Sequence, residues 1–443
     1  MALGEKTMIR VIYKIVYTMG FLVTWPYWIL RDMVHHKPYS FKARFLGPGR
    51  MLPKQKGRPR VWVWALSMGE VLAAKKLVPA LEEAGVEVII SSTTAIGRDA
   101  AARTFPSRLV LASPLDFGLS TRRFLDSVKP DLLVLVETDI WPGILFRMQQ
   151  RGLPKALVSA RISPRSFKGY GYIKVFWRRV LRLFDLITTQ NEDDRARLVG
   201  LGADPYTTHV IGDLKFDREV RLTTPESRAA VLDESGWPDG RWIVAGSTHA
   251  GEEALILDTF AELKSKDPEK YADLRLLLAP RNKSDFEAVW NLICERDVPA
   301  CHRGAPGADD KSKDIFLLDT LGELDRFYDL AEIALVGKSW AGQHKGGGHN
   351  PLEPASKGKP VLFGPMTHNY RWMTRALEAS GGGRMVPDQP ALLAALEELL
   401  DDPEKAREMG RKAADFVKIH QGGTERTMEL LRPFIEQAKE KSK

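Results

Sequence analysis

Short apolar runs alternate with amphipathic helical stretches along most of this chain, and this alternation constrains its fold more than any other feature. Continuous apolar strands that are separated by helices are typical of a parallel sheet with helices on both faces. The helical stretches include residues 71–84 and 141–151. The strands expected in a first series span residues 61–66, 86–90, 109–111, 132–136, 156–158, 186–189 and 209–211. We therefore predict a first α/β domain that ends near Asp217.

A second alternating series follows a polar segment, residues 218–240, which contains Pro225 and Pro238 and is expected to be a linker with one short helix. Its expected strands span residues 242–245, 274–279, 315–318, 333–336 and 360–363, and helical segments follow Gln389. A chain of 443 residues is too long for one ordinary core. We predict two Rossmann-like doubly wound domains, residues 39–217 and 241–443, that face a central cleft, because ligands of such sheets bind beyond the carboxyl ends of the strands.

The amino-terminal segment, residues 1–38, is expected to anchor the protein to a membrane surface. Residues 15–30 are uncharged and rich in aromatics, but the run is short for a spanning helix and Pro26 interrupts it. No small-residue cleavage site follows, so a secretory signal is not indicated. Nine basic residues and one acid lie between Arg31 and Arg60, a patch that could bind nucleic acid, anionic lipid or an acidic substrate. The aromatic run just before the patch favours an anionic membrane. The alternative is a first helix packed on the protein's own core.

Residues 346–354, with the sequence GGGHNPLEP, suggest a nucleotide site. Three glycines allow a sharp turn and a close approach to a ligand, and the helix expected to begin at Pro351 offers free N–H groups to an anion. Glu353 can accept hydrogen bonds from two ribose hydroxyls. A solvated surface loop is the alternative. His344 and His349 flank the glycines without an evident third ligand, so we expect neither a metal nor another cofactor.

Acidic residues follow two strands of the first domain. Glu70 lies at a strand-to-helix junction, where it could serve as a general base or merely cap the helix. Glu137 and Asp139 form a second acidic pair at the same expected sheet edge, and helix capping is the simpler role for Asp139.

Four polar loops of the second domain follow strands of one sheet, and together they predict one site. They are residues 246–249, 280–281, 320–323 and 350–353. Capping and turn formation can explain each loop singly, but hardly all four.

Six short motifs follow one another along the chain. They are residues 67–70 (SMGE), 137–142 (ETDIWP), 159–163 (SARIS), 212–217 (GDLKFD), 246–249 (GSTH) and 348–354 (GHNPLEP). In this order they resemble the motifs of the 3-deoxy-D-manno-octulosonic acid (Kdo) transferases, GT-B glycosyltransferases that act on lipid A precursors. The resemblance covers residues from about 39 to 423. The family usually has a histidine after the Pro-Arg pair, where this chain has Asn282.

The resemblance implies a role for each matching residue. Glu70 would be the general base, and Glu137 and Lys215 would stabilise the transition state. Three residues are candidates for the donor sugar: Ser247, Thr248 and His249. Three basic residues are candidates for acceptor phosphates, with a solvated basic face as the alternative: Arg161, Arg165 and Lys168. The contacts to CMP map to Pro280, Arg281, Leu321, Gly322, Glu323, Asn350, Pro351, Leu352 and Glu353.

The expected reaction is the inverting transfer of Kdo from CMP-Kdo to a phosphorylated, tetraacylated disaccharide precursor of lipid A, in lipopolysaccharide biosynthesis at the cytoplasmic face of the inner membrane. A GT-B enzyme with another nucleotide sugar and an inert lipid-binding homologue are the alternatives. The joint presence of Glu70, Glu137 and Lys215 weighs against both alternatives.

Overall fold

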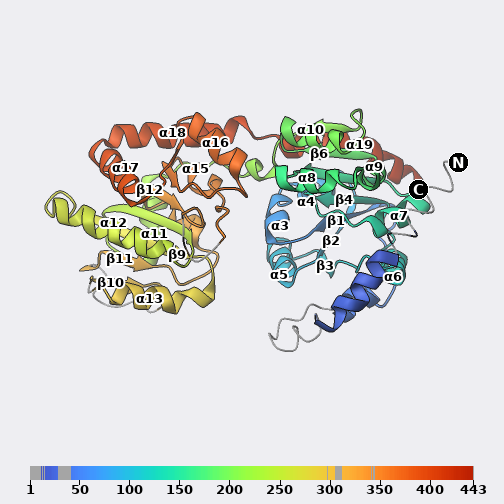
Figure 1. Ribbon diagram of the computed structural model, residues 1–443, viewed down its shortest axis with the longest axis horizontal. Coiled ribbons are helices and arrows are strands. Elements are labelled where there is room, and N and C mark those ends of the chain that lie inside the picture. Colours follow the sequence, from blue (N-terminus) through green and yellow to red (C-terminus); the bar gives the residue numbers. More distant parts are fainter. Residues whose placement is uncertain are drawn as a thin grey trace. The chain divides into compact units, whose positions relative to one another are not determined.

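The computed structural model describes residues 11, 13, 15–27, 41–296, 298–304, 312–340, 342 and 345–442. The chain divides into two compact units, the first formed by Met1–Asp217 and His420–Lys443 and the second by Arg218–Ile419. Each unit contains a sheet with helices packed against it (Figure 1).

The sheet of the first unit has seven strands in the order β3-β2-β1-β4-β5-β6-β7, and all neighbouring strands are parallel. All seven expected strands are confirmed, and every residue of β1 and β4 is buried because helices cover both faces. The strands are β1 (Arg60–Ala65), β2 (Glu87–Ser92), β3 (Leu109–Ala112), β4 (Leu132–Val136), β5 (Lys155–Ala160), β6 (Leu186–Thr189) and β7 (Thr208–Val210).

The helix expected over residues 71–84 is divided in two, since the chain turns at residues 74–76. The helices of this unit are α2 (Phe41–Leu46), α3 (Met68–Ala73), α4 (Leu77–Glu83), α5 (Ala95–Thr104), α6 (Gly118–Val128), α7 (Pro142–Gln150), α8 (Pro164–Gly171), α9 (Lys174–Leu181), α10 (Glu192–Gly200), the 3₁₀ turn η1 (Leu214–Asp217) and α19 (Gly423–Ser442).

Two tryptophans on β1 are fully buried although each carries a polar N–H group. The indole of Trp62 donates to Oγ of Ser91 at 2.8 Å, and that of Trp64 donates to Oγ1 of Thr93 at 3.2 Å. The two rings stack with centroids 5.1 Å apart. Because hydroxyls on and after the neighbouring strand β2 satisfy both indoles, these large side chains fill the core without an unpaired donor.

The sheet of the second unit is also parallel and seven-stranded, in the order β10-β11-β9-β8-β12-β13-β14. All five expected strands are present, and two short strands, β10 and β14, were not predicted. The strands are β8 (Arg241–Thr248), β9 (Leu274–Pro280), β10 (Ala300–His302), β11 (Ile315–Leu317), β12 (Ala331–Val336), β13 (Val361–Phe363) and β14 (Gly383–Met385).

Residues 218–240 belong to the second unit, so their prediction as a linker is wrong. The short helix is there, but Trp237 beyond it is only 3% exposed and packs on Trp242 and Phe316 of the core. The helices are α11 (Pro225–Ser235), α12 (Glu252–Lys266), the 3₁₀ turn η2 (Lys283–Asp285), α13 (Phe286–Cys294), α14 (Leu324–Phe327), α15 (Leu352–Ala355), α16 (Arg371–Ala379), α17 (Gln389–Asp401) and α18 (Pro403–Ile419).

The last helix, α19, belongs to the first unit, which corrects the predicted second domain of residues 241–443. Leu431 and Ile435 of α19 are buried in the core that also contains β1 and β4. The carboxylate of Asp217 accepts hydrogen bonds from the backbone N–H groups of Gly422, Gly423 and Thr424, where α19 begins. An apolar core and a carboxylate at its amino end therefore hold α19 against the first sheet.

Residues 15–27 are helical, and no helix of the described residues is long and apolar enough to cross a membrane. One face of this segment packs on the first unit, where the ring of Phe21 lies 5.6 Å from that of Phe117. Just before the segment, Tyr13 donates to Oδ2 of Asp116 at 2.5 Å. The other face is open, with Met19 63% exposed and Val23 78% exposed.

The predicted basic patch is only partly a surface feature. Arg60 is fully buried and forms an ion pair with Glu87 at 3.0 Å, and Arg44 is also buried, because each completes hydrogen bonds inside the fold. Lys54 pairs with Asp131. Arg31 and Lys37 lie outside the described residues.

Candidate active site

Glu137 directly follows β4 and adopts a left-handed backbone conformation with φ of 58°. Such a conformation is uncommon for a residue with a side chain and is held here by the surrounding structure. Its N–H donates to the carbonyl of Val158 at 2.9 Å, and its carboxylate is buried. The turn thus directs a carboxylate into the carboxyl edge of the first sheet.

Two cations meet this carboxylate. The ammonium of Lys215, from η1, contacts Oε1, and Nε of Arg161, beyond β5, lies 3.0 Å from Oε2. Burial alone raises the pKa of Glu137, but the charges and hydrogen bonds of Lys215 and Arg161 outweigh it and hold the pKa below its ordinary value. The structure therefore brings Glu137 and Lys215 together as an ionised pair.

Glu70 lies in the first turn of α3, half-buried, and forms a capping box with Ser67. Its Oε2 accepts hydrogen bonds from the backbone N–H of Ser67, at 3.0 Å, and from the Ser67 hydroxyl. The capping role that the sequence suggested is thus present. Glu70 also lies at the carboxyl edge of β1, next to β4, and this position suits a general base as well.

Asp139 does not cap α7, contrary to the simpler role expected for it. The N–H groups of Gly143 and Ile144 in the first turn of α7 donate instead to Asp116, both at 2.6 Å. Asp139 accepts from the indole of Trp141 at 2.7 Å. Burial, together with the nearby negative charge of Glu70, raises the pKa of Asp139 to about 6. Asp139 is therefore a second carboxyl group near Glu70, at the sheet edge where the sequence analysis expected an acidic pair.

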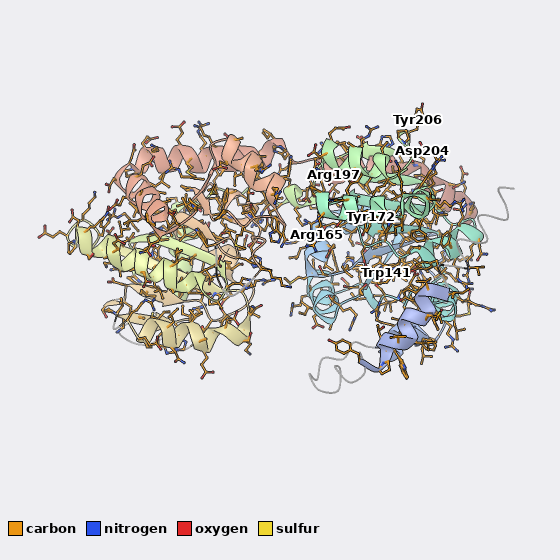
Figure 2. The ribbon with its side chains drawn as sticks, viewed as in Figure 1. Trp141, Arg165, Tyr172, Arg197, Asp204 and Tyr206 are labelled. Carbon is orange, nitrogen blue, oxygen red and sulfur yellow. The ribbon has the colours of Figure 1, made fainter. Side chains whose placement is uncertain are left out.

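The three acceptor candidates have different surroundings. Arg161 is committed to Glu137 and lies 43% exposed at the rim of the ion cluster. Arg165 and Lys168 project from α8 into solvent (Arg165 is labelled in Figure 2). Arg165 and Lys168 are thus accessible to an anionic ligand, as their predicted contact with acceptor phosphates requires.

In the second unit, the polar loops follow four neighbouring strands, β11, β9, β8 and β12, at their carboxyl ends. The N–H of Arg281, after β9, donates to the carbonyl of Thr248, the last residue of β8, at 3.0 Å. Ser247 is held at a positive φ of 57°. The arrangement confirms that the loops share one edge of one sheet.

A buried carboxylate that the sequence analysis did not single out links the loop of residues 246–249 to the segment just after β12. Glu252, in the first turn of α12, accepts hydrogen bonds from four backbone N–H groups, those of His249, Lys338, Ser339 and Trp340, over 2.6–3.0 Å. Burial raises its pKa and the four N–H groups lower it, with a net rise. The only indication of this role in the sequence was an acidic residue at the start of a helix, and such residues are common.

The glycine run is shaped by packing inside the protein. Gly346, Gly347 and Gly348 all have positive φ, and a Cβ on Gly347 would lie 2.3 Å from Nδ2 of Asn369. The backbone of Gly347 exchanges two hydrogen bonds with the segment of Met366 and Asn369. A loop of the same unit therefore fills the space at Gly347. This packing accounts for the glycines without the ligand that the sequence analysis expected them to make room for.

Glu353 occupies the first turn of α15, as expected, but Pro351 is the N-cap and not the first helical residue. The side chain of Asn350 accepts from the N–H of Leu352 at 3.1 Å. Burial raises the pKa of Glu353, and the positive charges of Arg218 and Arg281 oppose that rise. The structure thus places Arg281 and Glu353, predicted from two separate loops, within electrostatic reach of each other.

His249 and His349 face each other, with their Nε2 atoms 2.9 Å apart and their rings stacked at 5.2 Å. At least one ring must be neutral at its Nε2 atom for this contact to be a hydrogen bond. His349 was considered only with His344, which lies outside the described residues, as a possible metal ligand. Its partner is the donor-sugar candidate His249 instead.

The loop of residues 320–323 presents an apolar side chain and a partnered carboxylate. Leu321 is 58% exposed, and Gly322 turns the chain with φ of 95°. Glu323 accepts from the hydroxyl of Thr320 and lies 3.5 Å from Arg303. An exposed leucine next to a glycine turn gives a flat apolar contact that suits the face of a base.

Comparison with known proteins identifies the family. Residues 40–218 match the family model described as 3-deoxy-D-manno-octulosonic-acid transferase (kdotransferase). The chain is 34% identical to the 3-deoxy-D-manno-octulosonic acid transferase of Bordetella pertussis over 89% of this chain and 91% of that protein. It is 31% identical to the transferase of the same name from Haemophilus influenzae, over 85% of this chain and 87% of that one.

Solved structures support the fold. UDP-GlcNAc 2-epimerase from Neisseria meningitidis superposes with a TM-score of 0.59 at 14% identity, covering 84% of this chain and all of the epimerase. A glycosyltransferase from Rickettsia africae gives a TM-score of 0.58 at 12% identity, covering 85% of this chain and 99% of that one. The two parallel sheets are thus those of a GT-B protein. With the coverage and identity of its relatives, the chain belongs to the 3-deoxy-D-manno-octulosonic acid transferase family.

Proposed function

We propose that this protein transfers Kdo from CMP-Kdo to a phosphorylated, tetraacylated disaccharide precursor of lipid A in lipopolysaccharide biosynthesis. The observation that carries the proposal is the ion cluster of the buried Glu137 with Lys215 and the half-exposed Arg161, in a chain that belongs to the Kdo transferase family. An ionised, preorganised cluster at a sheet edge is the kind of arrangement that stabilises charge developing in a transition state.

In the proposed reaction Glu70 removes the proton from an acceptor hydroxyl. The oxygen of that hydroxyl then forms a bond to the anomeric carbon of Kdo while the bond from this carbon to the phosphate of CMP breaks, with inversion. Lys215 and Arg161 supply fixed positive charge for the developing anion. No metal and no other cofactor enters this scheme.

The donor is assigned to the loops of the second unit. Glu353, held beside Arg281, would accept from the ribose hydroxyls, and Arg281 would face the phosphate. Leu321 would contact the cytosine, and the paired rings of His249 and His349 would lie at the sugar. The walls of the donor site would be completed by Pro280, Gly322, Glu323, Asn350, Pro351, Leu352, Ser247 and Thr248.

The acceptor is assigned to the first unit. Arg165 and Lys168 on α8 are exposed and would contact its phosphates. We place the protein at the cytoplasmic face of the inner membrane, because residues 15–27 present an open apolar face that acyl chains or lipid could cover.

The experiment that tests the proposal is incubation of the full-length protein with CMP-Kdo and the tetraacylated precursor, with the product weighed by mass spectrometry. A mass increase of one or more Kdo units is expected, and it also gives their number. CMP-sialic acid serves as the control donor. A product formed only with another nucleotide sugar, or none with any donor tried, would refute the assignment.

A further inference from the structure

A cavity of about 470 Å³ lies in the second unit at the amino ends of β12 and β13. Asp329 and Glu332 border it at β12, and Lys357, Gly358 and Lys359 border it just before β13. Because the strands of this sheet are parallel, this edge is opposite to the one where the candidate nucleotide loops emerge. The function proposed above does not use this cavity.

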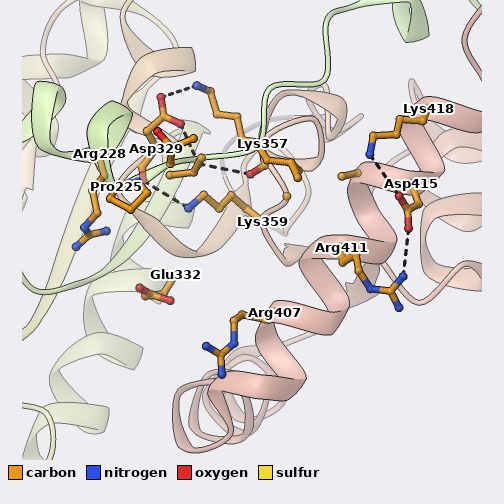
Figure 3. A pocket seen from close by; sticks show the side chains of 15 residues that line it. Pro225, Arg228, Asp329, Glu332, Lys357, Lys359, Arg407, Arg411, Asp415 and Lys418 are labelled. Atoms are coloured by element: carbon orange, nitrogen blue, oxygen red, sulfur yellow. Dashed lines mark hydrogen bonds and ion pairs between the residues drawn. The ribbon is translucent and has the colours of Figure 1, made fainter.

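The lining is strongly basic. Figure 3 shows the side chains of α18 along one wall and those of Arg228, Lys357 and Lys359 across from them. Three acids line the cavity, Asp329, Glu332 and Asp415. Two further acids outside the lining, Asp239 and Glu404, pair with Arg228 and Arg407, so six basic residues face five acids and leave an excess of one positive charge. The six basic residues are Arg228, Lys357, Lys359, Arg407, Arg411 and Lys418.

Lys359 carries the least compensated of these charges. Among the described residues, the hydrogen bond of its ammonium is a long one, 3.4 Å, to the carbonyl oxygen of Asp329. The carboxylate of Asp329 is occupied by Lys357 at 2.7 Å and by the hydroxyl of Thr223 at 2.8 Å. Burial lowers the pKa of Lys359 to about 8, although Glu332 and Asp329 attract its charge. A half-buried ammonium with one weak partner is costly unless an anion joins it.

The facing wall offers donors in a row. Arg407, Arg411 and Lys418 are four and seven residues apart, a spacing that places them on one face of α18. Arg411 and Lys418 share one carboxylate, that of Asp415, at 3.4 and 3.6 Å. These two contacts are loose, whereas Arg407 pairs closely with Glu404 at 2.7 Å. Because a guanidinium has five N–H donors, Arg407 and Arg411 each retain donors for a ligand.

Both ends of the second unit's chain contribute to the cavity. Residues 222–225, close to the first residue of this unit, Arg218, form one side, and Lys418 adjoins its last residue, Ile419. The backbone of Thr223 is tied to the carbonyl of Lys357 at 3.2 Å. An anion bound here would therefore link the two segments through which the chain enters and leaves the unit.

We propose that this cavity binds a small, freely diffusing phosphate monoester, at a site separate from the donor nucleotide. A phosphate monoester carries about 1.5–2 negative charges and three acceptor oxygens, which match a site with several cationic donors and an excess of positive charge. The volume is that of sites for small metabolites and exceeds what a bare ion would fill.

Lysine acetylation of the full-length protein, read by peptide mass spectrometry with and without glycerol phosphate, tests the site directly. At a concentration twice the Kd, occupancy should slow the acetylation of Lys359 and Lys418 about threefold. Lys412 is the control, because it lies on the same helix but lines a different groove. Sodium chloride at equal ionic strength should not protect. Protection by chloride equal to that by glycerol phosphate would mean simple screening and would overturn the proposal.

Variants give an independent measure. Arg411→Gln and Lys359→Gln should each weaken the binding of glycerol phosphate about tenfold in calorimetry, whereas Lys412→Gln should not. Arg411 is 67% exposed, so its variant is expected to fold even if the Lys359 variant does not. Binding by Arg411→Gln as tight as by the parent would overturn the site. Protection of Lys359 by phosphatidic acid vesicles but not by glycerol phosphate would assign the phosphate to a lipid headgroup and would overturn the proposed soluble ligand.

Discussion

Lys215 donates a hydrogen bond to Oε1 of Glu137, although 78 positions separate the two residues in the chain. The contact joins the end of β4 to the turn η1, after the last strand of the sheet. Lys215 is 13% exposed and Glu137 5% exposed, so water screens the pair little. The fold of the whole first unit is needed to form it.

Replacing Lys215 by methionine should therefore cost both stability and activity. We expect a loss of about 2 kcal/mol in the free energy of unfolding, less than the ~3–5 kcal/mol for a fully unpaired buried charge, because Arg161 remains. Turnover should fall by about 100-fold or more. Urea unfolding and the transfer assay measure the two effects, with Lys174→Met, at an exposed position of α9 that has no assigned role, as the control. Parental stability and turnover in Lys215→Met would contradict the role of the pair.

The pH dependence of stability has a definite sign at Glu137. Its pKa in the folded protein is lowered from the ordinary value of 4.5, so its stabilising contribution is fully present above pH 4.5 and is lost as pH falls through the folded value. The difference in unfolding free energy between the parent and Glu137→Gln should therefore shrink as pH falls from about 6 to below 4. A constant difference over this range would show that the ionised form is not the stabilising one.

Glu70→Gln separates catalysis from helix capping. Glutamine can still accept from the N–H of Ser67, so we expect little change in melting and a fall in turnover of about 100-fold or more, as for loss of a positioned base. Ser67→Ala is the matched control, since it removes the other half of the capping box and should cost about 1 kcal/mol of stability with a far smaller effect on turnover. Equal turnover losses in the two variants would assign Glu70 to structure alone.

Glu353→Gln should raise the KM for the donor while turnover at saturating donor changes less, because a ribose contact present in both ground and transition states contributes uniform binding. Calorimetry with CMP provides a second readout. Glu397→Gln, on α17 where the carboxylate is half-buried and pairs with Lys266, is the control. If CMP binds the Glu353 variant as it binds the parent, Glu353 is not at the nucleotide.

Continuous apolar runs predicted the strands well because both sheets are buried on both faces, and their order in the chain predicted the two units. The missed strands, β10 and β14, have three residues each and include His302 and Arg384, so they carry no apolar signal. The assignment of α19 failed for another reason. An amphipathic helix shows that it has an apolar face, but not which core covers that face.

The site was predictable where function places a polar group at the end of a strand, as at Glu137 and Glu353. It was not predictable where a contact depends on chain segments far apart. The partner of Glu252 is a row of N–H groups beyond β12, and the partner of His249 is a ring one hundred residues away. Likewise, the sequence counted Arg60 as part of a basic surface, although Glu87 and several carbonyl groups enclose it. Charge in a sequence does not reveal burial.

The membrane prediction concerns the open face of residues 15–27. Met19 and Val23 are 63% and 78% exposed, whereas Tyr13 and Phe21 hold the segment to Asp116 and Phe117 on its other side. Replacing Met19 and Val23 together by glutamine should therefore leave the cooperative melt unchanged and should reduce sedimentation with vesicles of anionic lipid. The apolar contribution is insensitive to salt, so intact protein should resist extraction by high salt and yield to detergent.

Two further variants separate anchoring from packing in this segment. Tyr13→Phe removes the hydrogen bond to Asp116 and should lower the melting temperature while vesicle binding persists. Removal of the first 33 residues takes away both faces of the segment. If anchoring is the main role of these residues, the remaining protein should keep a cooperative melt in circular dichroism. It should also be released from vesicles by salt alone, because the attraction of its remaining basic residues to the lipid fades with ionic strength. A truncated protein without a cooperative melt, together with undiminished vesicle binding by the Met19 and Val23 double variant, would mean that the segment serves the fold and that the membrane contact lies elsewhere.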